Sequence, residues 1–169
     1  NAALQELIRR YFRYACEYAL GFVEKDTVER AELIMREMNV KPEDRRVVEP
    51  ARAAGESAAA RGKGHKGVYV GSAMELPNGT IVTGVNSPLL HAASSLLLNA
   101  GKTMAGIPDP IPLLSASTLE AVARPKEDIL GMNSASLNVD EVLICLSLGA
   151  AANPSAQLAL DKLKSLRGS

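Results

Sequence analysis

The stretch Glu-Leu-Pro-Asn-Gly-Thr-Ile-Val-Thr-Gly, at residues 75–84, decides the fold. Residues 77–79, Pro-Asn-Gly, are a turn signal, and the β-branched residues 81–83 are good strand formers. Upstream, the run Val-Tyr-Val at residues 68–70 has the same strand character. The pattern therefore predicts a β-hairpin over residues 68–85, closed by an Asn-Gly turn.

A helix is expected directly after the hairpin. Ser87 is a good N-cap residue, and Pro88 suits the first helical position, where no backbone N–H is needed. The pattern predicts a helix from residue 88 to about residue 104. Because this segment is apolar around most of its circumference, we expect it to be largely buried.

The remainder of the C-terminal half has three further helix signals. A Pro-rich connector spans residues 106–115, and its end favours one short strand. Ser117 then caps one predicted helix, and Asn138 with Glu141 begins another that ends near Asn153-Pro154. A last helix follows and has basic residues at its negative end. The sequence thus predicts four helices packed with the hairpin.

Two amphipathic helices are predicted at the N-terminus. Apolar and aromatic residues recur at helical spacing over residues 3–21, namely Leu4, Leu7, Tyr11, Tyr14 and Tyr18. In the second helix Asp26 is the expected cap, with Glu29 three residues later. Its apolar seam is formed by Val28, Ala31, Met35 and Met38. Residues 3–39 therefore read as an antiparallel helical hairpin.

The expected fold class is α/β in the α+β sense, mainly helical, with an N-terminal helical hairpin followed by a small sheet and packed helices. Pro42 suits the first turn of a third helix, and the Ala-rich residues 51–60 favour another helical segment. We expect residues 1–61 to hold the helical hairpin and the Ala-rich helix, residues 62–67 to be a flexible loop, and residues 68–169 to form an α/β domain.

Composition limits the partners and the compartment. Nineteen Lys and Arg balance nineteen Asp and Glu, which argues against a nucleic-acid partner. Cys16 and Cys145 form no CxxC pair, so we expect no metal site and no disulfide framework. The longest apolar runs are far shorter than a membrane span of about 20 residues. No leader pattern opens the chain, so we expect a cytoplasmic protein without a membrane partner.

The segment Gly-Lys-Gly-His-Lys-Gly, at residues 62–67, matches the letters of a dinucleotide-binding GxGxxG motif. That motif needs a strand before it and a helix after it, because the phosphates rest on the helix N-terminus. Here the predicted helix comes before and the predicted strand after. We therefore interpret residues 62–67 as a solvated linker rather than a nucleotide site.

One candidate ligand pocket lies where the hairpin meets the next helix. Thr83, Gly84, Asn86, Ser87 and His91 surround this junction, and free amides at a helix start bind phosphate or carboxylate. His91 also begins a polar stripe that continues through Ser95, Asn99 and Lys102. The alternative is an ordinary capped helix, since capping alone explains Ser87. No metal ligand set and no catalytic residue can be assigned.

The hairpin followed by His91-Ala92-Ala93 is also similar to the start of a zinc nucleoside deaminase. That chemistry needs a His-x-Glu pair and a later pair of cysteines. Residue 93 is Ala, and Cys145 is alone in an apolar segment. An active deaminase is therefore excluded, whereas an inactive relative of that fold stays open.

Several strings resemble one bacterial family, number eighteen forty-six among the domains of unknown function. They are residues 75–84, residues 87–100, Ala-Gly-Ile-Pro-Asp at 105–109, Leu-Asn-Val-Asp-Glu-Val-Leu-Ile at 137–144 and Ala-Ala-Asn-Pro at 151–154. The N-terminal residues Arg9-Arg10-Tyr11-Phe12 and Glu32-Leu33-Ile34-Met35 fit as well. None of these strings is a catalytic motif.

The resemblance implies that the chain is the C-terminal part of a longer protein whose upstream part carries a Gly-rich, P-loop-like stretch. A nucleotide cofactor is then expected in that missing N-terminal part and none in this segment. The first hypothesis is a structural and interaction role, with the missing domain and further copies of the chain as partners. The alternative is an enzyme half-site at residues 83–91 for a phosphorylated or carboxylated small molecule. Whether the protein is an enzyme stays open.

Overall fold

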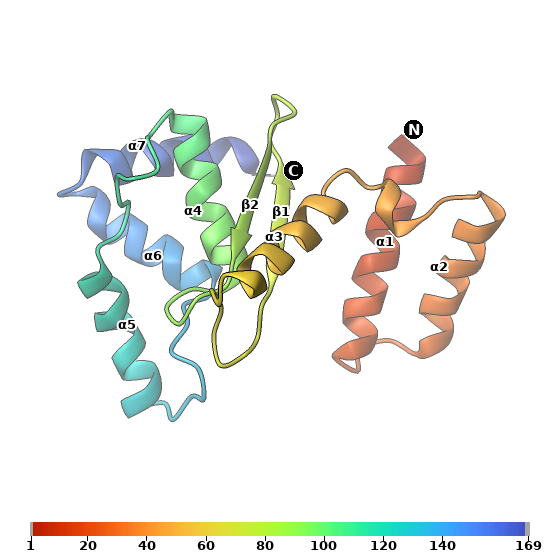
Figure 1. Ribbon diagram of the computed structural model, residues 1–169, viewed down its shortest axis with the longest axis horizontal. Coiled ribbons are helices and arrows are strands. Elements are labelled where there is room, and N and C mark those ends of the chain that lie inside the picture. Colours follow the sequence, from red (N-terminus) through yellow and green to blue (C-terminus); the bar gives the residue numbers. More distant parts are fainter. Residues whose placement is uncertain (1, 168–169) are drawn as a thin grey trace. The chain divides into compact units, whose positions relative to one another are not determined.

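A computed structural model describes residues 2–167, which fall into two compact units. Unit 1 ends at Glu49 and unit 2 begins at Pro50. The fold is α+β and mainly helical, as expected (Figure 1). The domain ranges that the sequence suggested, with a boundary at residues 62–67, stay a prediction.

Unit 1 is the expected helical hairpin. Helix α1 (Ala2–Ala19) packs against α2 (Lys25–Glu37), and a short 3-10 turn, η1 (Pro42–Asp44), follows (Figure 1). The small core of the unit consists of Ile8, Met35 and Val40, with Leu4, Leu7, Tyr11 and Phe12 packed around it. The N-terminal part of the predicted apolar stripe therefore faces the second helix.

Two local expectations for α2 were wrong. The N-cap residue is Glu24, whose side chain makes no capping bond, and Asp26 instead bonds to Arg30 at 2.7 Å within the helix. Met38 is exposed rather than part of the seam. Because the helix ends at Glu37, Met38 is the C-cap residue and leaves the helical face that packs on α1.

Unit 2 contains the expected β-hairpin. Strands β1 (Gly71–Glu75) and β2 (Ile81–Val85) are antiparallel, and Gly71 pairs with Val85 at one end while Glu75 pairs with Ile81 at the other. Gly79 in the connecting turn has φ +82°, a conformation that glycine adopts readily. Residues 68–70 lie before β1 rather than in it, with Val70 N–H bonded to the Asn86 side chain at 2.8 Å.

Two helices lie against the hairpin, and a glycine permits each contact. Helix α3 (Val48–Ala60) includes the Ala-rich segment, and α4 (Ala92–Ala105) lies along β2 (Figure 1). A Cβ on Gly84 would lie 2.7 Å from Ala92 O and closer still to the backbone of Leu96. Gly71 is equally crowded by the backbone of α3. The close approach at Gly84 is thus a contact between strand and helix.

The predicted start of α4 at residue 88 was wrong, because α4 begins at Ala92 with His91 as its N-cap residue. Leu89 O accepts a bond from Leu137 N–H at 2.9 Å, and His91 N–H donates to Leu137 O at 3.1 Å. This pairing, which includes a parallel bridge between Leu90 and Leu137, holds residues 89–91 in an extended conformation. A contact remote in sequence therefore delays the helix.

Helix α5 (Ala116–Asp128) begins two residues earlier than expected, because Ser115 rather than Ser117 is its N-cap residue. The Ser115 hydroxyl accepts a bond from Thr118 N–H at 3.1 Å. Pro125 lies inside the helix. The short strand expected at the end of the connector is absent, since the structure assigns no strand to residues 106–115.

Helix α6 begins as the sequence indicated, and the segment where it was expected to end begins α7. Helix α6 (Val139–Ala150) starts with a reciprocal capping box, in which Glu141 N–H donates to Asn138 Oδ1 at 2.9 Å and Asn138 N–H donates to Glu141 Oε2 at 2.8 Å. Asn153 caps α7 (Pro154–Leu163), which η2 (Lys164–Leu166) extends.

Three apolar clusters join the elements of unit 2. The hairpin meets α4 through Leu76, Val82, Leu96 and Ala100. The pairing of α4, α6 and α7 buries Leu146, Ala156, Ala159 and Leu163 together with Ile107 and Leu113. A third cluster joins α5 and α6 and contains Leu119, Ala123, Leu137, Val142 and Cys145. Among the described helices, none combines the length and the apolar character that crossing a bilayer requires.

Candidate functional site

The predicted junction site is occupied largely by bonds within the fold. The Asn86 amide donates to Val68 O at 3.0 Å and accepts from Val70 N–H at 2.8 Å, so it closes the open end of the hairpin. Its backbone N–H donates to Val70 O at 3.1 Å. Asn86 therefore continues the ladder of β1 and β2 by means of its side chain.

The Ser87 side chain is likewise bonded within the fold. Its hydroxyl accepts bonds from Leu89 N–H at 3.3 Å and Leu90 N–H at 3.1 Å. The backbone oxygens of Ser87 and Pro88 accept bonds from the buried Ser136 hydroxyl at 3.2 and 3.0 Å. Ser87 thus caps a tight turn before α4 rather than α4 itself.

The other predicted residues lie beside this turn. His91 is exposed and its side chain makes no capping bond. Thr83 O accepts a bond from the Asn99 amide at 2.9 Å, and Gly84 O accepts one from the Ser72 hydroxyl at 3.1 Å. The five residues therefore surround one junction, but ligand binding there stays a prediction.

A hollow of about 360 Å³ lies next to the junction and includes most of the predicted polar stripe. We call it the α4 hollow. Residues from the end of the hairpin, from α4, from the connector and from the start of α5 line it, namely Val85, Ser87, Leu90, Ser95, Leu98, Asn99, Lys102, Pro112, Leu113, Leu114 and Leu119. Of the predicted stripe, Ser95, Asn99 and Lys102 line this hollow, whereas His91 does not.

A buried ion pair between α5 and α6 escaped the sequence analysis. Lys126 Nζ lies 2.7 Å from Glu141 Oε2 and donates a second bond of 2.7 Å to Ser136 O. The Lys126 side chain is 6% exposed and that of Glu141 is 25% exposed. The two residues are fifteen positions apart in sequence, and nothing in their local patterns pairs them. Glu141 therefore serves both the cap of α6 and the contact with α5.

The charge of this pair is stabilised by its surroundings. Burial raises the pKa of the Glu141 carboxyl, but the hydrogen bonds from Lys126 and from Asn138 N–H lower it by more. The pKa of Glu141 therefore lies below its ordinary value, and the carboxylate is ionised at neutral pH. Burial also raises the pKa of the nearby Cys145 thiol, which belongs to the apolar cluster between α5 and α6.

The Gly-rich residues 62–67 form turns tied to neighbouring segments. His65 and Val68 exchange backbone hydrogen bonds of 3.1 and 2.9 Å, and Lys66 Nζ donates to Asn133 O at 3.1 Å. No helix follows them directly, since β1 is the next element of the chain. The arrangement that a dinucleotide motif requires is therefore absent from this part of the described chain.

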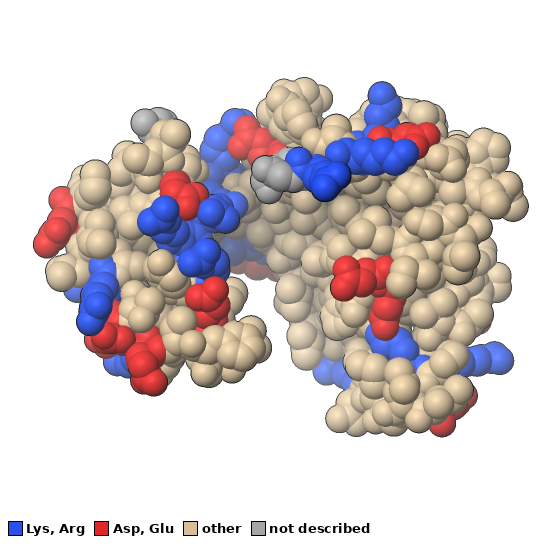
Figure 2. Space-filling model, turned by 180° about the vertical axis from the view of Figure 1, so that it is seen from behind, with Lys and Arg blue, Asp and Glu red and all other residues tan. Residues whose placement is uncertain are grey.

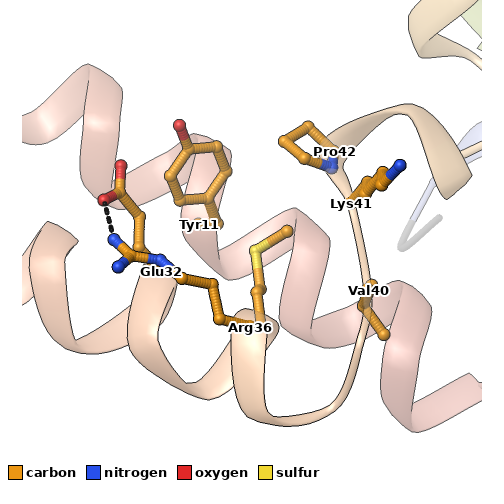
Figure 3. Close-up of a pocket in the computed structure, with 7 residues that line it drawn as sticks. Tyr11, Glu32, Arg36, Val40, Lys41 and Pro42 are labelled. Carbon is orange, nitrogen blue, oxygen red and sulfur yellow. Dashed lines mark hydrogen bonds and ion pairs between the residues drawn. The ribbon is translucent and has the colours of Figure 1, made fainter.

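A second hollow, of about 260 Å³, lies within unit 1. Figure 3 shows the Tyr11 ring from α1 near the side chains of α2, with Pro42 and Lys41 on the following segment. Arg36 is bonded to Glu32 at 3.3 Å along its own helix. The lining of this hollow is therefore partly apolar, and two of its charged side chains, Arg36 and Glu32, are paired with each other.

Charged side chains on the surface form local pairs of opposite charge rather than a patch of one sign. Glu6 bonds to Arg9 at 2.7 Å and to Arg10 at 2.9 Å, and these arginines hold the pKa of Glu6 at about 2. Figure 2 shows Lys and Arg beside Asp and Glu on unit 1, and broad uncharged areas on unit 2. Within residues 2–167, no three His, Cys, Asp or Glu side chains are grouped as a metal site.

Comparison with known proteins assigns the chain to a family. The protein-family model described as "Domain of unknown function DUF1846, C-terminal" matches residues 43–169. The chain is 43% identical over 169 residues to a UPF0371 protein of Clostridium tetani (strain Massachusetts / E88). It is 46% identical over 168 residues to a UPF0371 protein of Clostridium botulinum (strain Langeland / NCTC 10281 / Type F). The alignments cover 99% of this chain and 33% of each relative.

The chain therefore belongs to the family of unknown function DUF1846, as its sequence strings indicated, and corresponds to the C-terminal domain of that family. It spans about one third of the length of the curated relatives that it matches.

Proposed function

We propose that this chain is a structural and interaction part of a longer cytoplasmic protein. In this proposal unit 1 mediates association between copies of the chain, and unit 2 packs against the remaining part of the protein. The observation that carries the proposal is that large apolar side chains are exposed on both units. Such surfaces are costly in water and typically mark contacts with other proteins.

On unit 1, the exposed large apolar residues lie from the end of α1 through the turn between the helices, and again in α2 and at its C-cap. The Phe22 side chain is 75% exposed, and Leu20, Leu33 and Met38 are exposed as well. Aromatic residues are enriched at protein interfaces because they bury a large area with little loss of rotamer freedom. This distribution supports self-association through the helical hairpin.

On unit 2, the exposed apolar residues include two on α6. Ile144 and Leu148 are one helical turn apart and both point away from the core, with Leu148 75% exposed. The opposite side of α6 buries Val142, Cys145 and Leu146. A helix that is apolar on both sides is typical of a buried element, so this supports a further partner for α6.

The partner for α6 can come from the same polypeptide in a longer protein. Two thirds of each matched relative lies outside the region that aligns with this chain. We propose that this remaining part covers α6 and handles a nucleotide. Hydrogen exchange of the α6 amides tests the contact, because they should exchange more slowly in a full-length family member than in this chain. Equal exchange rates would refute it.

Analytical ultracentrifugation tests self-association. We expect the wild-type chain to sediment as a dimer or larger species, and Phe22→Ser to shift it toward the monomer. Ile129→Ser is the matched control, because Ile129 is 77% exposed but lies on unit 2. A monomeric wild-type chain, or an equal effect of both variants, would contradict this function.

A second candidate function is an enzyme half-site at the junction of residues 83–91, which binds a phosphorylated or carboxylated small molecule. The α4 hollow beside the junction supports it, because ligand sites are concave and combine apolar walls with a few polar groups. Thermal unfolding with phosphate, nucleotides and small acids tests it. An unchanged melting temperature across that panel would remove this candidate for the chain.

A further inference from the structure

We propose that the α4 hollow binds a small aliphatic carboxylate, with the carboxylate at Lys102 and the hydrocarbon part along the leucine wall. The inference rests on the second candidate function. It places the ligand in the α4 hollow rather than at the junction of residues 83–91, and it specifies the chemical class of the ligand. It does not depend on self-association. At about 360 Å³, the hollow is at the small end of the range for ligand pockets.

The walls favour a hydrocarbon. Most lining residues are apolar, and Leu98 on α4 packs in the same apolar cluster as Leu113 and Leu114 of the connector. Leu119 and Leu90 complete this wall. The hollow is open to solvent, so a hydrocarbon that enters it would release water from the apolar surface that the wall still exposes. A sugar or a nucleobase would leave its polar groups without partners along this wall.

The charge favours a carboxylate over a phosphate. Lys102 is the one charged residue among those that line the hollow. Its ammonium donates one bond of 2.7 Å to Asp109 O, which holds it in place and leaves two N–H groups. Phosphate sites typically combine several cations or a set of backbone N–H groups. One ammonium balances the single charge of a carboxylate.

The polar stripe on α4 gives the ligand a direction. Ser95, Asn99 and Lys102 follow one another at spacings of four and three, so they share one face of the helix. The Asn99 amide nitrogen donates one of its two N–H groups to Thr83 O at 2.9 Å, so this side chain is neutral and Lys102 supplies the positive charge that attracts an anion. The carboxylate is thus expected at the Lys102 end and the hydrocarbon toward Ser95 and Leu90.

The test is a titration of the full 169-residue chain followed by ¹H–¹⁵N NMR, with hexanoate, hexylamine and inorganic phosphate as separate probes. We expect hexanoate to give saturable shifts at amides around the α4 hollow and to bind at least about tenfold more tightly than hexylamine. Lys102→Gln should remove this preference. Lys162→Gln, on the exposed side of α7, should leave it unchanged.

Several results would overturn the inference. They are the absence of saturable hexanoate shifts, equal binding of hexanoate and hexylamine, or wild-type affinity in Lys102→Gln. Binding of hexanoate or phosphate with shifts confined to the amides of Asn86 and His91 would also overturn it, while supporting the junction site. The absence of shifts with every probe would count against both the hollow and the second candidate function.

Discussion

Lys126 is expected to contribute more to the stability of unit 2 than any surface charge, and Lys126→Met tests this. Methionine keeps the apolar stem of the buried side chain and removes only the ammonium group. The substitution therefore breaks the 2.7 Å bonds to Ser136 O and to Glu141 without opening a large cavity.

The expected loss follows from what each partner retains. Ser136 is buried, so leaving its carbonyl without the ammonium costs about 1–3 kcal/mol. Glu141 keeps its bond from Asn138 N–H, and its side chain is 25% exposed, so water can hydrate the charge. The cost of leaving Glu141 without the ammonium therefore falls well below the roughly 3–5 kcal/mol typical of breaking a fully buried ion pair. We expect a total loss of about 2–3 kcal/mol.

The assay must report on unit 2 alone, because the chain contains two compact units. Native-state hydrogen exchange of amides in α5 and α6, measured at increasing urea concentration, meets this need. Lys162→Met is the matched control, since Lys162 is exposed on α7 and its loss should change the free energy of unfolding by less than about 0.5 kcal/mol. An equally small loss in Lys126→Met would refute the reasoning.

Three further predictions follow from the same contacts. Gly84→Ala should destabilise unit 2 by about 1–3 kcal/mol in urea unfolding, because the added Cβ meets the backbone of α4. Gly149→Ala is the control and should be neutral or stabilising, because the nearest atom to its added Cβ is 3.9 Å away. Equal effects of the two substitutions would contradict this prediction. Asn138→Ala should cost about 1 kcal/mol by loss of the α6 cap, measured as faster exchange of α6 amides, and unchanged exchange would argue against it. Because the pKa of Glu141 is lowered on folding, its contribution to stability is present at neutral pH and is lost as the pH falls through that lowered pKa. The stability difference between the wild type and Lys126→Met should therefore narrow in acid, and a pH-independent difference would count against the ion pair.

The candidate site was only partly predictable. The helical spacing of Ser95, Asn99 and Lys102 correctly placed them on one face, because periodicity within a helix is a local property. The backbone amides that follow Ser87 are not free as expected, because those of Leu89 and Leu90 bond to the Ser87 hydroxyl, and pairing with Leu137 postpones the helix to Ala92. Local capping signals cannot register a partner that is about fifty residues away.

The sequence by itself determined the elements whose energetics are local. The Asn-Gly turn required a positive φ at Gly79, and the Asn138–Glu141 capping box closed over four residues. Only the tertiary structure decided the ion pair of Lys126 and Glu141 and the walls of the α4 hollow. The reason is physical: a cap or a turn is complete within a few residues, whereas these contacts join separate helices and depend on how the apolar clusters dock them.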